Sequence, residues 1–273
     1  MPDNNNMNDF FLSASIKRLL KDVRDIYKEP LDSDGIYYKH DENDCNFGYA
    51  LIIGPRDSIY ENGYYFFKFE FPCDYPHTPP KVIFHTNDGI VRFHPNFYRN
   101  GKVCLSLLNT WRGEGWTSCQ SIKSVLLTLC SLLANDSLLN EPGITKHNKD
   151  FNTYNDIIQF KNISVAITSM MNSNSGIYPS PTFDIFKDTV NKHFIDNYEK
   201  NLTRIDSLIK KQSNGKIKSQ LSTSIYNMKI TVDYKKIKTQ IKGIYSNIAK
   251  TNNIEKKTNS IEIKQNEKIE IKK

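Results

Sequence analysis

Four short runs rich in Tyr, Phe, Ile and Val follow one another early in the chain, and they constrain the fold more than any other feature. They are "IYYKH" (36–40), "FGYALIIG" (47–54), "YYFFKFEF" (64–71) and "KVIFHT" (81–86). Pro55, the Asn62-Gly63 pair and "FPCDYPHTPP" separate them, as turns do between strands. The connections are too short to hold helical crossovers, so we predict a four-stranded antiparallel meander.

Helical periodicity appears on both sides of these runs. The segment "SASIKRLLKDVRDIY" (13–27) begins near a serine cap and spaces its apolar residues as an amphipathic helix does: Ile16, Leu19, Leu20, Val23, Ile26 and Tyr27. Residues 118–136, 150–171 and 182–200 are predicted to form further helices. One helix, then strands, then helices indicates an α+β domain.

The charge of the chain is unevenly distributed. Residues 201–273 hold 17 Lys and Arg against 6 Asp and Glu, a net charge of +11, whereas the whole chain carries +7. We therefore expect a folded domain at 1–200, with its core at about 10–175. A basic tail rich in Lys, Ile and Asn should follow it at 201–273. Interspersed charges leave this tail little apolar surface to bury, so we expect partial disorder. A solvated tail is favoured over an electrostatic tether, and we expect no nucleic-acid binding.

The cysteines bear on the cellular environment. There are five, widely spaced and without a Cys-x-x-Cys pair: Cys45, Cys73, Cys104, Cys119 and Cys130. Such a set indicates reduced thiols rather than a disulfide framework. The start, "MPDNNNMNDFF", lacks a signal-peptide core, and no apolar run reaches the roughly 20 residues that span a bilayer. We expect an intracellular protein, cytoplasmic or nuclear, that is neither secreted nor membrane-spanning.

The segment "FHPNFYRNGKVCLSLLNTW" (93–111) poses the central functional question, the role of Cys104. A single cysteine is more often a small buried hydrophobe than a catalyst. Here the turn residues "RNG" precede it and the polar, Gly-rich "NTWRGEGW" follows it, which favours an accessible thiol. The amide of Asn96 could donate a hydrogen bond to an oxyanion that develops on an acyl group at the sulfur.

Three other interpretations stay open from these residues alone. A Cys-His hydrolase would pair Cys104 with His94 or His147, but no hydrolase motif accompanies them. A zinc site could use four side chains as ligands, although their spacing matches no usual zinc pattern: Cys73, His77, His85 and His94. A binding module would hold a partner on the same surface without catalysis.

The motifs "YPHTPPKVIFHT", "FHPNFYRNGKVCLSLL" and "NEPG" together resemble the ubiquitin-conjugating enzymes, most of all the large Z-type members and the conjugating domain of apollon. The family pattern has Tyr-Pro-x-x-Pro-Pro, then His-Pro-Asn, then the acceptor cysteine eight residues past the Asn. The match covers about residues 10–175. It implies the ubiquitin-conjugating fold, with an N-terminal helix, a four-stranded antiparallel meander sheet and C-terminal helices.

The resemblance also implies an activity. Such a protein is a monomeric acyltransferase that accepts ubiquitin or a ubiquitin-like protein from an activating enzyme as a thioester. It passes the modifier to a substrate lysine or to a ubiquitin ligase, and it needs no cofactor or metal.

Individual roles follow from the same resemblance. Cys104 matches the thioester-forming cysteine. Asn96 matches the residue that is proposed to donate a hydrogen bond to the oxyanion. Its alternative role is structural, to brace the active-site loop. His94 and Pro95 would order that loop. Glu141 matches an acidic residue that positions or deprotonates the incoming lysine, with an ordinary surface charge as its alternative.

The resemblance assigns partner-binding positions as well. Lys17, Arg18 and Lys21 on the first helix match the surface that docks the activating enzyme, against the alternative of a solvated helix face. His77 and Ser118 lie in the two loops that contact ubiquitin ligases.

The sequence departs from the family at several of these positions. His77 stands where a hydrophobic residue is usual, and Thr117-Ser118-Cys119 replaces Ser-Pro-Ala. Ser106 replaces the Asp that many members carry two residues after the cysteine. Ligase recognition therefore stays open, as do the modifier, the chain linkage and the use of the outer sheet face, where some members bind a second ubiquitin.

Overall fold

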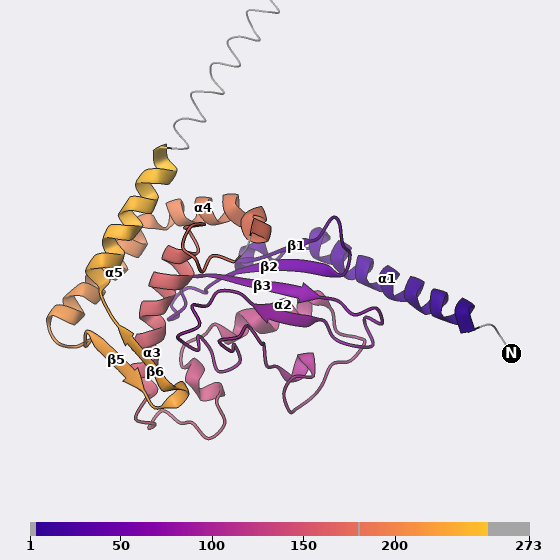
Figure 1. Cartoon of the computed structure of the whole chain (residues 1–273), viewed down its shortest axis with the longest axis horizontal. Coiled ribbons are helices and arrows are strands. Elements are labelled where there is room, and N and C mark those ends of the chain that lie inside the picture. Colours follow the sequence, from indigo (N-terminus) through magenta and orange to yellow (C-terminus); the bar gives the residue numbers. More distant parts are fainter. Residues whose placement is uncertain (1–3, 180, 251–273) are drawn as a thin grey trace, which may run out of the picture.

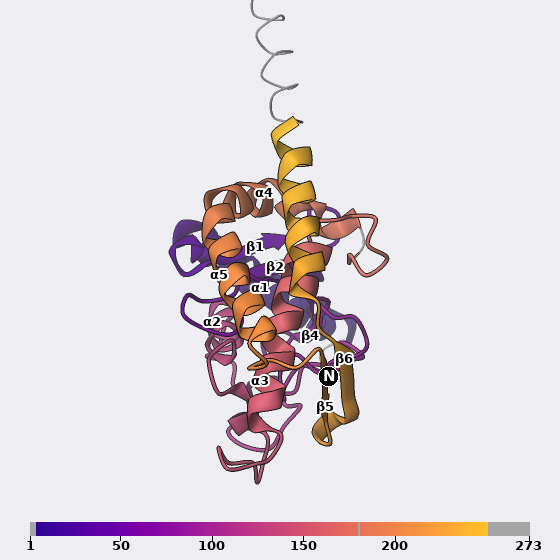
Figure 2. The same ribbon diagram turned by 90° about the vertical axis from the view of Figure 1, so that its left-hand side faces the viewer.

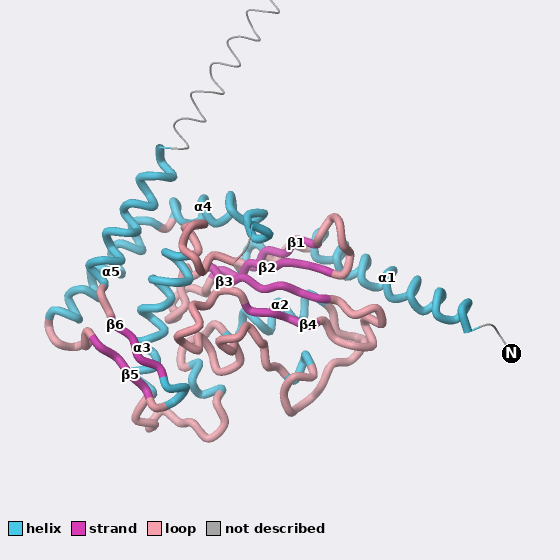
Figure 3. The backbone as a smooth tube through the Cα atoms, viewed as in Figure 1, coloured by secondary structure: helices cyan, strands magenta, loops and turns pink. Residues whose placement is uncertain are grey.

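The computed structural model describes residues 4–179 and 181–250. A long N-terminal helix precedes a sheet, and further helices follow it (Figure 1). The sheet holds its strands in sequence order: β1 (Ile36–His40), β2 (Phe47–Ile53), β3 (Tyr64–Glu70) and β4 (Lys81–Phe84). Every neighbouring pair is antiparallel, so the predicted α+β architecture with a four-stranded meander is confirmed (Figure 3).

The inner face of the sheet carries the main core. Phe67 on β3 lies 5.4 Å from Phe84 on β4, measured between ring centroids. The helix α2 (Ile122–Leu132) adds its buried apolar side to the same core. It begins where Ser121 and Ser124 cap each other's backbone N–H groups, which satisfies donors that the first turn of a helix leaves unpaired.

The outer face of the sheet is covered too, by two elements of the same chain: η5 (Pro181–Phe186) and α4 (Lys187–Asp196). The rings of Phe66 on β3 and Phe183 on η5 lie 5.1 Å apart. The hydroxyl of Tyr64 donates to the Val190 carbonyl on α4 at 3.3 Å. Burial on both faces explains why the run 64–67 is apolar without alternation, since a half-exposed strand would alternate.

The first helix is longer than the sequence predicted. α1 spans Asn4–Lys28, so it begins well before the expected serine cap. Only part of its predicted apolar stripe packs on the domain, with Leu19 and Val23 buried. Leu20 and Tyr27 are about half exposed, at 47% and 52%, because the contact with the domain is narrower than the stripe. No helix within 4–179 and 181–250 has the length and apolarity to cross a bilayer.

The helix expected at 150–171 is present but changes form midway. α3 (Phe151–Lys161) continues into a π-helical segment, η4 (Asn162–Ser169). Asn162 is fully buried at the junction, where its amide oxygen accepts from the Tyr65 hydroxyl at 2.6 Å and its amide nitrogen donates to the Glu61 carbonyl at 2.9 Å. These bonds tie the helix to β3 and to the loop before it.

Residues 201–250 differ from the expected loose tail. They continue α5 (Tyr198–Ser213), which crosses the predicted boundary at 201, and then form a hairpin, β5 (Gln220–Thr223) and β6 (Met228–Thr231), and a helix over 234–250. Ile205, Leu208, Tyr234 and Ile241 are buried. The apolar residues recur at helical spacing, so one side packs while the lysines face outward. The part of the predicted tail at 251–273 lies outside the described residues.

The two C-terminal helices lie side by side (Figure 2). The rings of Tyr198 on α5 and Tyr245 on the last helix stack with centroids 3.9 Å apart. Lys238 and Asp206 form an ion pair at 2.5 Å between the same two helices. The hairpin β5–β6 connects them, so α5, hairpin and last helix form one packed extension of the domain.

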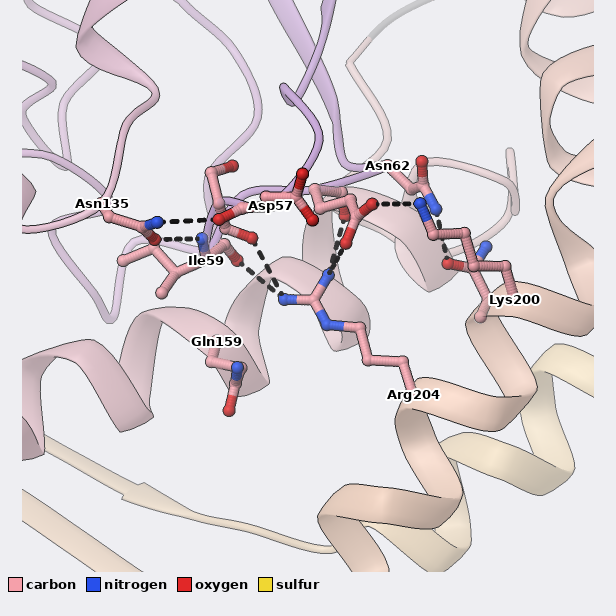
Figure 4. A pocket seen from close by; sticks show the side chains of 10 residues that line it. Asp57, Ile59, Asn62, Asn135, Gln159, Lys200 and Arg204 are labelled. Carbon is pink, nitrogen blue, oxygen red and sulfur yellow. Dashed lines mark hydrogen bonds and ion pairs between the residues drawn. The ribbon is translucent and has the colours of Figure 1, made fainter.

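This extension is attached to the sheet through the loop over residues 57–62 (Figure 4). The Arg204 guanidinium on α5 donates to the Glu61 carbonyl at 3.1 Å, and Lys200 pairs with the Glu61 carboxylate at 2.5 Å. The Asn62 amide donates to Asn201 at 2.9 Å. Backbone carbonyls of the loop and the buried Glu61 carboxylate are therefore bonded to side chains of α5.

Candidate functional site

Cys104 and Asn96 lie on two adjacent antiparallel segments. The Cys104 N–H donates to the Asn96 carbonyl at 2.9 Å, and the Asn96 side-chain amide donates to the Cys104 carbonyl at 2.5 Å. The turn between them closes at Gly101, whose N–H donates to the Tyr98 carbonyl at 3.0 Å and whose φ is +85°. A glycine suits this left-handed position. The eight-residue spacing thus folds back to place Asn96 beside Cys104.

The thiol is less accessible than the sequence predicted. Cys104 is 3% exposed, and its Sγ lies 3.0 Å from the Thr110 carbonyl oxygen. The Thr110 hydroxyl accepts from the Leu105 N–H at 2.9 Å, which holds this carbonyl in place over the sulfur. The Gly-rich loop that was expected to leave the thiol open instead folds across it, while Trp111 in that loop stays 48% exposed.

His94 is fully buried between the Asn96 segment and Asn140. Its Nδ1 accepts from the Asn96 N–H at 3.0 Å, and its Nε2 lies 3.5 Å from the Asn140 amide nitrogen. Burial, helped by the nearby positive charge of Arg92, lowers the pKa of His94 to about 3. The ring is therefore neutral near pH 7 and acts as a hydrogen-bonding spacer between two loops. Pro95, also buried, presents its carbonyl to the Arg92 Nε at 3.0 Å.

The geometry of Asn96 is compatible with both predicted roles. One N–H of its amide braces the backbone at Cys104. Its Oδ1 is buried and accepts no hydrogen bond from the described residues. A primary amide has two N–H donors, so a second one is available to an oxyanion on the sulfur.

Glu141 follows directly after Asn140, at the end of η3 (Ser137–Asn140). Its carboxylate accepts a hydrogen bond from the Tyr226 hydroxyl at 2.5 Å. The contact between His94 and Asn140 joins this loop to the Cys104 segment. Sequence reasoning missed Tyr226 because it lies 85 residues further along the chain, in a region predicted to be a loose tail.

The predicted docking surface for the activating enzyme is divided by the structure. Lys17 and Lys21 are exposed on α1. Arg18 is half-buried and donates to the carbonyls of Ser118 and Gln120, each at 2.6 Å. Arg18 also pairs with the Asp22 carboxylate at 2.9 Å. Of the three predicted docking residues, Arg18 therefore ties α1 to the 117–120 loop, whereas Lys17 and Lys21 form no ion pair with the described residues.

The two predicted ligase-contact positions lie in loops that contact each other. The side chain of Trp116 donates through Nε1 to the Pro76 carbonyl at 2.6 Å. His77 and Ser118, which flank this contact in the sequence, are both exposed. The structure therefore brings these two positions onto neighbouring loops.

The competing sites find no matching geometry in the described part of the chain. There, the Cys104 thiol bonds to the Thr110 carbonyl and to no histidine. No group of three or more His, Cys, Asp or Glu side chains among residues 4–179 and 181–250 could hold a metal ion. His85 from the zinc alternative packs against Phe183, with ring centroids 5.1 Å apart.

Comparison with known proteins identifies the family. The family model described as ubiquitin-conjugating enzyme matches residues 18–162. The chain is 40% identical to ubiquitin-conjugating enzyme E2 Z of Xenopus tropicalis over 187 residues, 67% of this chain and 58% of that protein. It is 42% identical to ubiquitin-conjugating enzyme E2 Z of Homo sapiens over 185 residues, 67% of this chain and 50% of that one.

A larger human protein also contains a similar region. The chain is 34% identical over 203 residues to the dual E2 ubiquitin-conjugating enzyme/E3 ubiquitin-protein ligase BIRC6 of Homo sapiens, which is 69% of this chain and 4% of that protein. The chain spans about half the length of the E2 Z relatives. The family match runs from α1 to the end of α3 and includes Cys104 and its loop. This chain belongs to the ubiquitin-conjugating enzyme family.

Proposed function

We propose that this chain is an acyltransferase that carries ubiquitin, or a ubiquitin-like protein, on Cys104. The observation that supports it most is the paired Asn96 and Cys104, which sets an amide donor beside a thiol at the family spacing. The family core at about 10–175 supplies the reacting groups, and residues 198–250 form an extension that packs on this core. The protein acts in the cytoplasm or nucleus.

In the first step, the Cys104 sulfur attacks the carbonyl of a thioester held by an activating enzyme. A new carbon–sulfur bond forms, the donor thiolate leaves, and the proton of Cys104 goes to that thiolate or to solvent. Sulfur is both a good nucleophile and a good leaving group, so the exchange is close to balanced in energy. The Thr110 carbonyl that covers the sulfur must move aside for this attack.

In the second step, a lysine amine attacks the thioester on Cys104, and the cysteine thiolate leaves. The free N–H of the Asn96 amide stabilises the oxyanion that forms, and the Glu141 carboxylate holds or accepts a proton of the lysine ammonium. Lys17 and Lys21 steer the activating enzyme to α1. His77 and Ser118 face the ligase.

A charging assay tests this function. Incubation with an activating enzyme, ATP and ubiquitin should give an adduct that reductant removes. Cys104→Ser should give an adduct that survives reductant, because an oxyester is not exchanged by thiols, and Cys104→Ala should give none. Cys130→Ala, at a half-buried cysteine in α2, is the matched control and should charge normally. A Cys104→Ala protein that still forms a thiol-sensitive adduct would exclude the proposal.

A further inference from the structure

The C-terminal hairpin places one tyrosine against Glu141, the carboxylate proposed to receive the lysine. Tyr226 lies in the turn between β5 and β6, with a left-handed φ of +57°. Its hydroxyl donates to the Oε2 of Glu141 at 2.5 Å. Glu141 has no other side-chain hydrogen bond or ion pair to the described residues, so Oε1 is available to a ligand.

The turn that carries Tyr226 is held on several sides, independently of Glu141. The Arg99 guanidinium donates to the Tyr226 carbonyl. The Ile225 N–H donates to the Asp150 carboxylate at 2.8 Å. The Arg92 guanidinium lies 4.5 Å from the centre of the Tyr226 ring, a cation–π contact. The phenol therefore reaches Glu141 from a rigid support.

The same turn is connected to the loop that contains Asn96. Arg92, which covers the Tyr226 ring, also donates to the Pro95 carbonyl. On the other side, Asn140 precedes Glu141 and contacts His94. Tyr226 thus contacts Arg92, which bonds to the loop of Asn96, and Glu141, whose neighbour Asn140 contacts His94 in the same loop.

We propose that Tyr226 is a positioning residue, which holds one oxygen of the Glu141 carboxylate so that the other can receive the incoming lysine ammonium. This inference rests on the proposed function, and it assigns the C-terminal extension a part in the transfer step. Fixing a carboxylate favours reaction because the substrate amine then meets a group that is already oriented.

The phenol remains a donor throughout the useful pH range. Burial, followed by the hydrogen bond to Glu141, raises the pKa of Tyr226 above that of a free tyrosine. Among the described residues, the other charged or titratable groups that face the turn are Arg92, Arg99, Tyr98, Tyr154 and Asp150.

The test separates charging from transfer. Tyr226→Phe removes only the hydroxyl and keeps the ring beneath Arg92. It should charge at the parent rate. Discharge to free lysine from pre-charged protein should slow by about tenfold, less than the roughly hundredfold loss typical of removing a general base. The difference in discharge rate between the parent and Tyr226→Phe should shrink as the pH rises toward about 10.4, the pKa of the lysine ammonium. At that pH much of the free lysine is already deprotonated and needs no carboxylate to accept its proton.

Two further variants make the result decisive. Tyr98→Phe removes a hydroxyl from the same cluster, one that donates to no described residue, and should discharge normally. In a Glu141→Gln background, Tyr226→Phe should have no further effect, because the carboxylate it positions is gone. Unchanged or faster discharge by Tyr226→Phe, or an equal loss in the Glu141→Gln background, would overturn the inference. Failure of the parent protein to charge would instead count against the proposed function.

Discussion

Phe183 lies against Phe66 with ring centroids 5.1 Å apart, so a residue from beyond the family match covers the outer face of the sheet. Phe183 also contacts Tyr49 on β2, with centroids 5.6 Å apart. Here η5 and α4 occupy the same surface, and Phe183 is 2% exposed.

The first prediction concerns this cover. Phe183→Ala should lower the free energy of unfolding by about 3–5 kcal/mol, the usual cost of removing a buried phenylalanine ring. Ile185→Ala is the matched control, because Ile185 lies two residues away and is 50% exposed; it should change stability by less than about 0.5 kcal/mol. Urea denaturation measures both. Equal effects of the two substitutions would show that η5 does not pack on the sheet in solution.

The second prediction concerns Asn96. Asn96→Ser removes both amide donors, the one that braces Cys104 and the one available to the oxyanion. Charging should persist, while discharge of the thioester to free lysine should slow by about a hundredfold, a typical cost of one oxyanion donor. Asn100→Ser, at an exposed position in the adjoining turn, should discharge normally. A rate equal to that of the parent would remove Asn96 from the mechanism.

The third prediction concerns pH and His94. Burial lowers the pKa of His94 to about 3, against about 6.5 in an unfolded chain. Between these values the unfolded chain binds a proton that the folded protein does not. His94 therefore destabilises the fold as the pH falls below about 6.5, by up to roughly 1.4 kcal/mol per pH unit.

Substitution isolates this contribution. In His94→Gln, whose side chain does not titrate, the free energy of unfolding should fall less steeply between pH 6.5 and 4 than in the parent. Urea denaturation at several pH values measures the slope. His77→Gln, at an exposed histidine, should keep the parent slope. Parallel slopes for the parent and His94→Gln would mean that His94 titrates normally in the folded protein.

The fourth prediction divides the basic surface of α1. Lys17→Glu combined with Lys21→Glu should slow charging by the activating enzyme, most at low salt, because exposed charges steer association and are screened by ions. Discharge of pre-charged protein and thermal stability should stay at the parent level. Normal charging at low salt would favour a solvated helix face.

Arg18 should behave differently from its neighbours. Arg18→Met removes the donor to the carbonyls of Ser118 and Gln120 and also the cation paired with the buried Asp22 carboxylate. The free energy of unfolding should therefore fall by about 1–3 kcal/mol. Thermal or urea denaturation measures this. An Arg18→Met protein of parent stability that charges slowly would place Arg18 with the docking lysines.

The features that the sequence alone determined are local. Turn residues and short connections were enough to predict the four-stranded meander, because adjacent antiparallel strands can be joined by a short turn. The spacing between Asn96 and Cys104 predicted their proximity for the same reason. A turn that closes at Gly101 folds the eight-residue segment back on itself. Local spacing of apolar side chains likewise predicted helical structure up to residue 200, although the single helix expected at 182–200 is divided among η5, α4 and the start of α5.

Only the tertiary structure decided which distant residues meet. Arg18 differs from Lys17 and Lys21 because carbonyls 100 and 102 residues away lie within its reach. Tyr226 meets Glu141 from a segment whose composition predicted no packed core. The lysines there made the composition polar, yet Ile205 and Ile241 are buried, and Tyr234 packs on Phe160 of α3 with ring centroids 5.3 Å apart. Whether a side chain is buried depends on the apolar surface that the rest of the fold offers it. The composition of a segment does not reveal that surface.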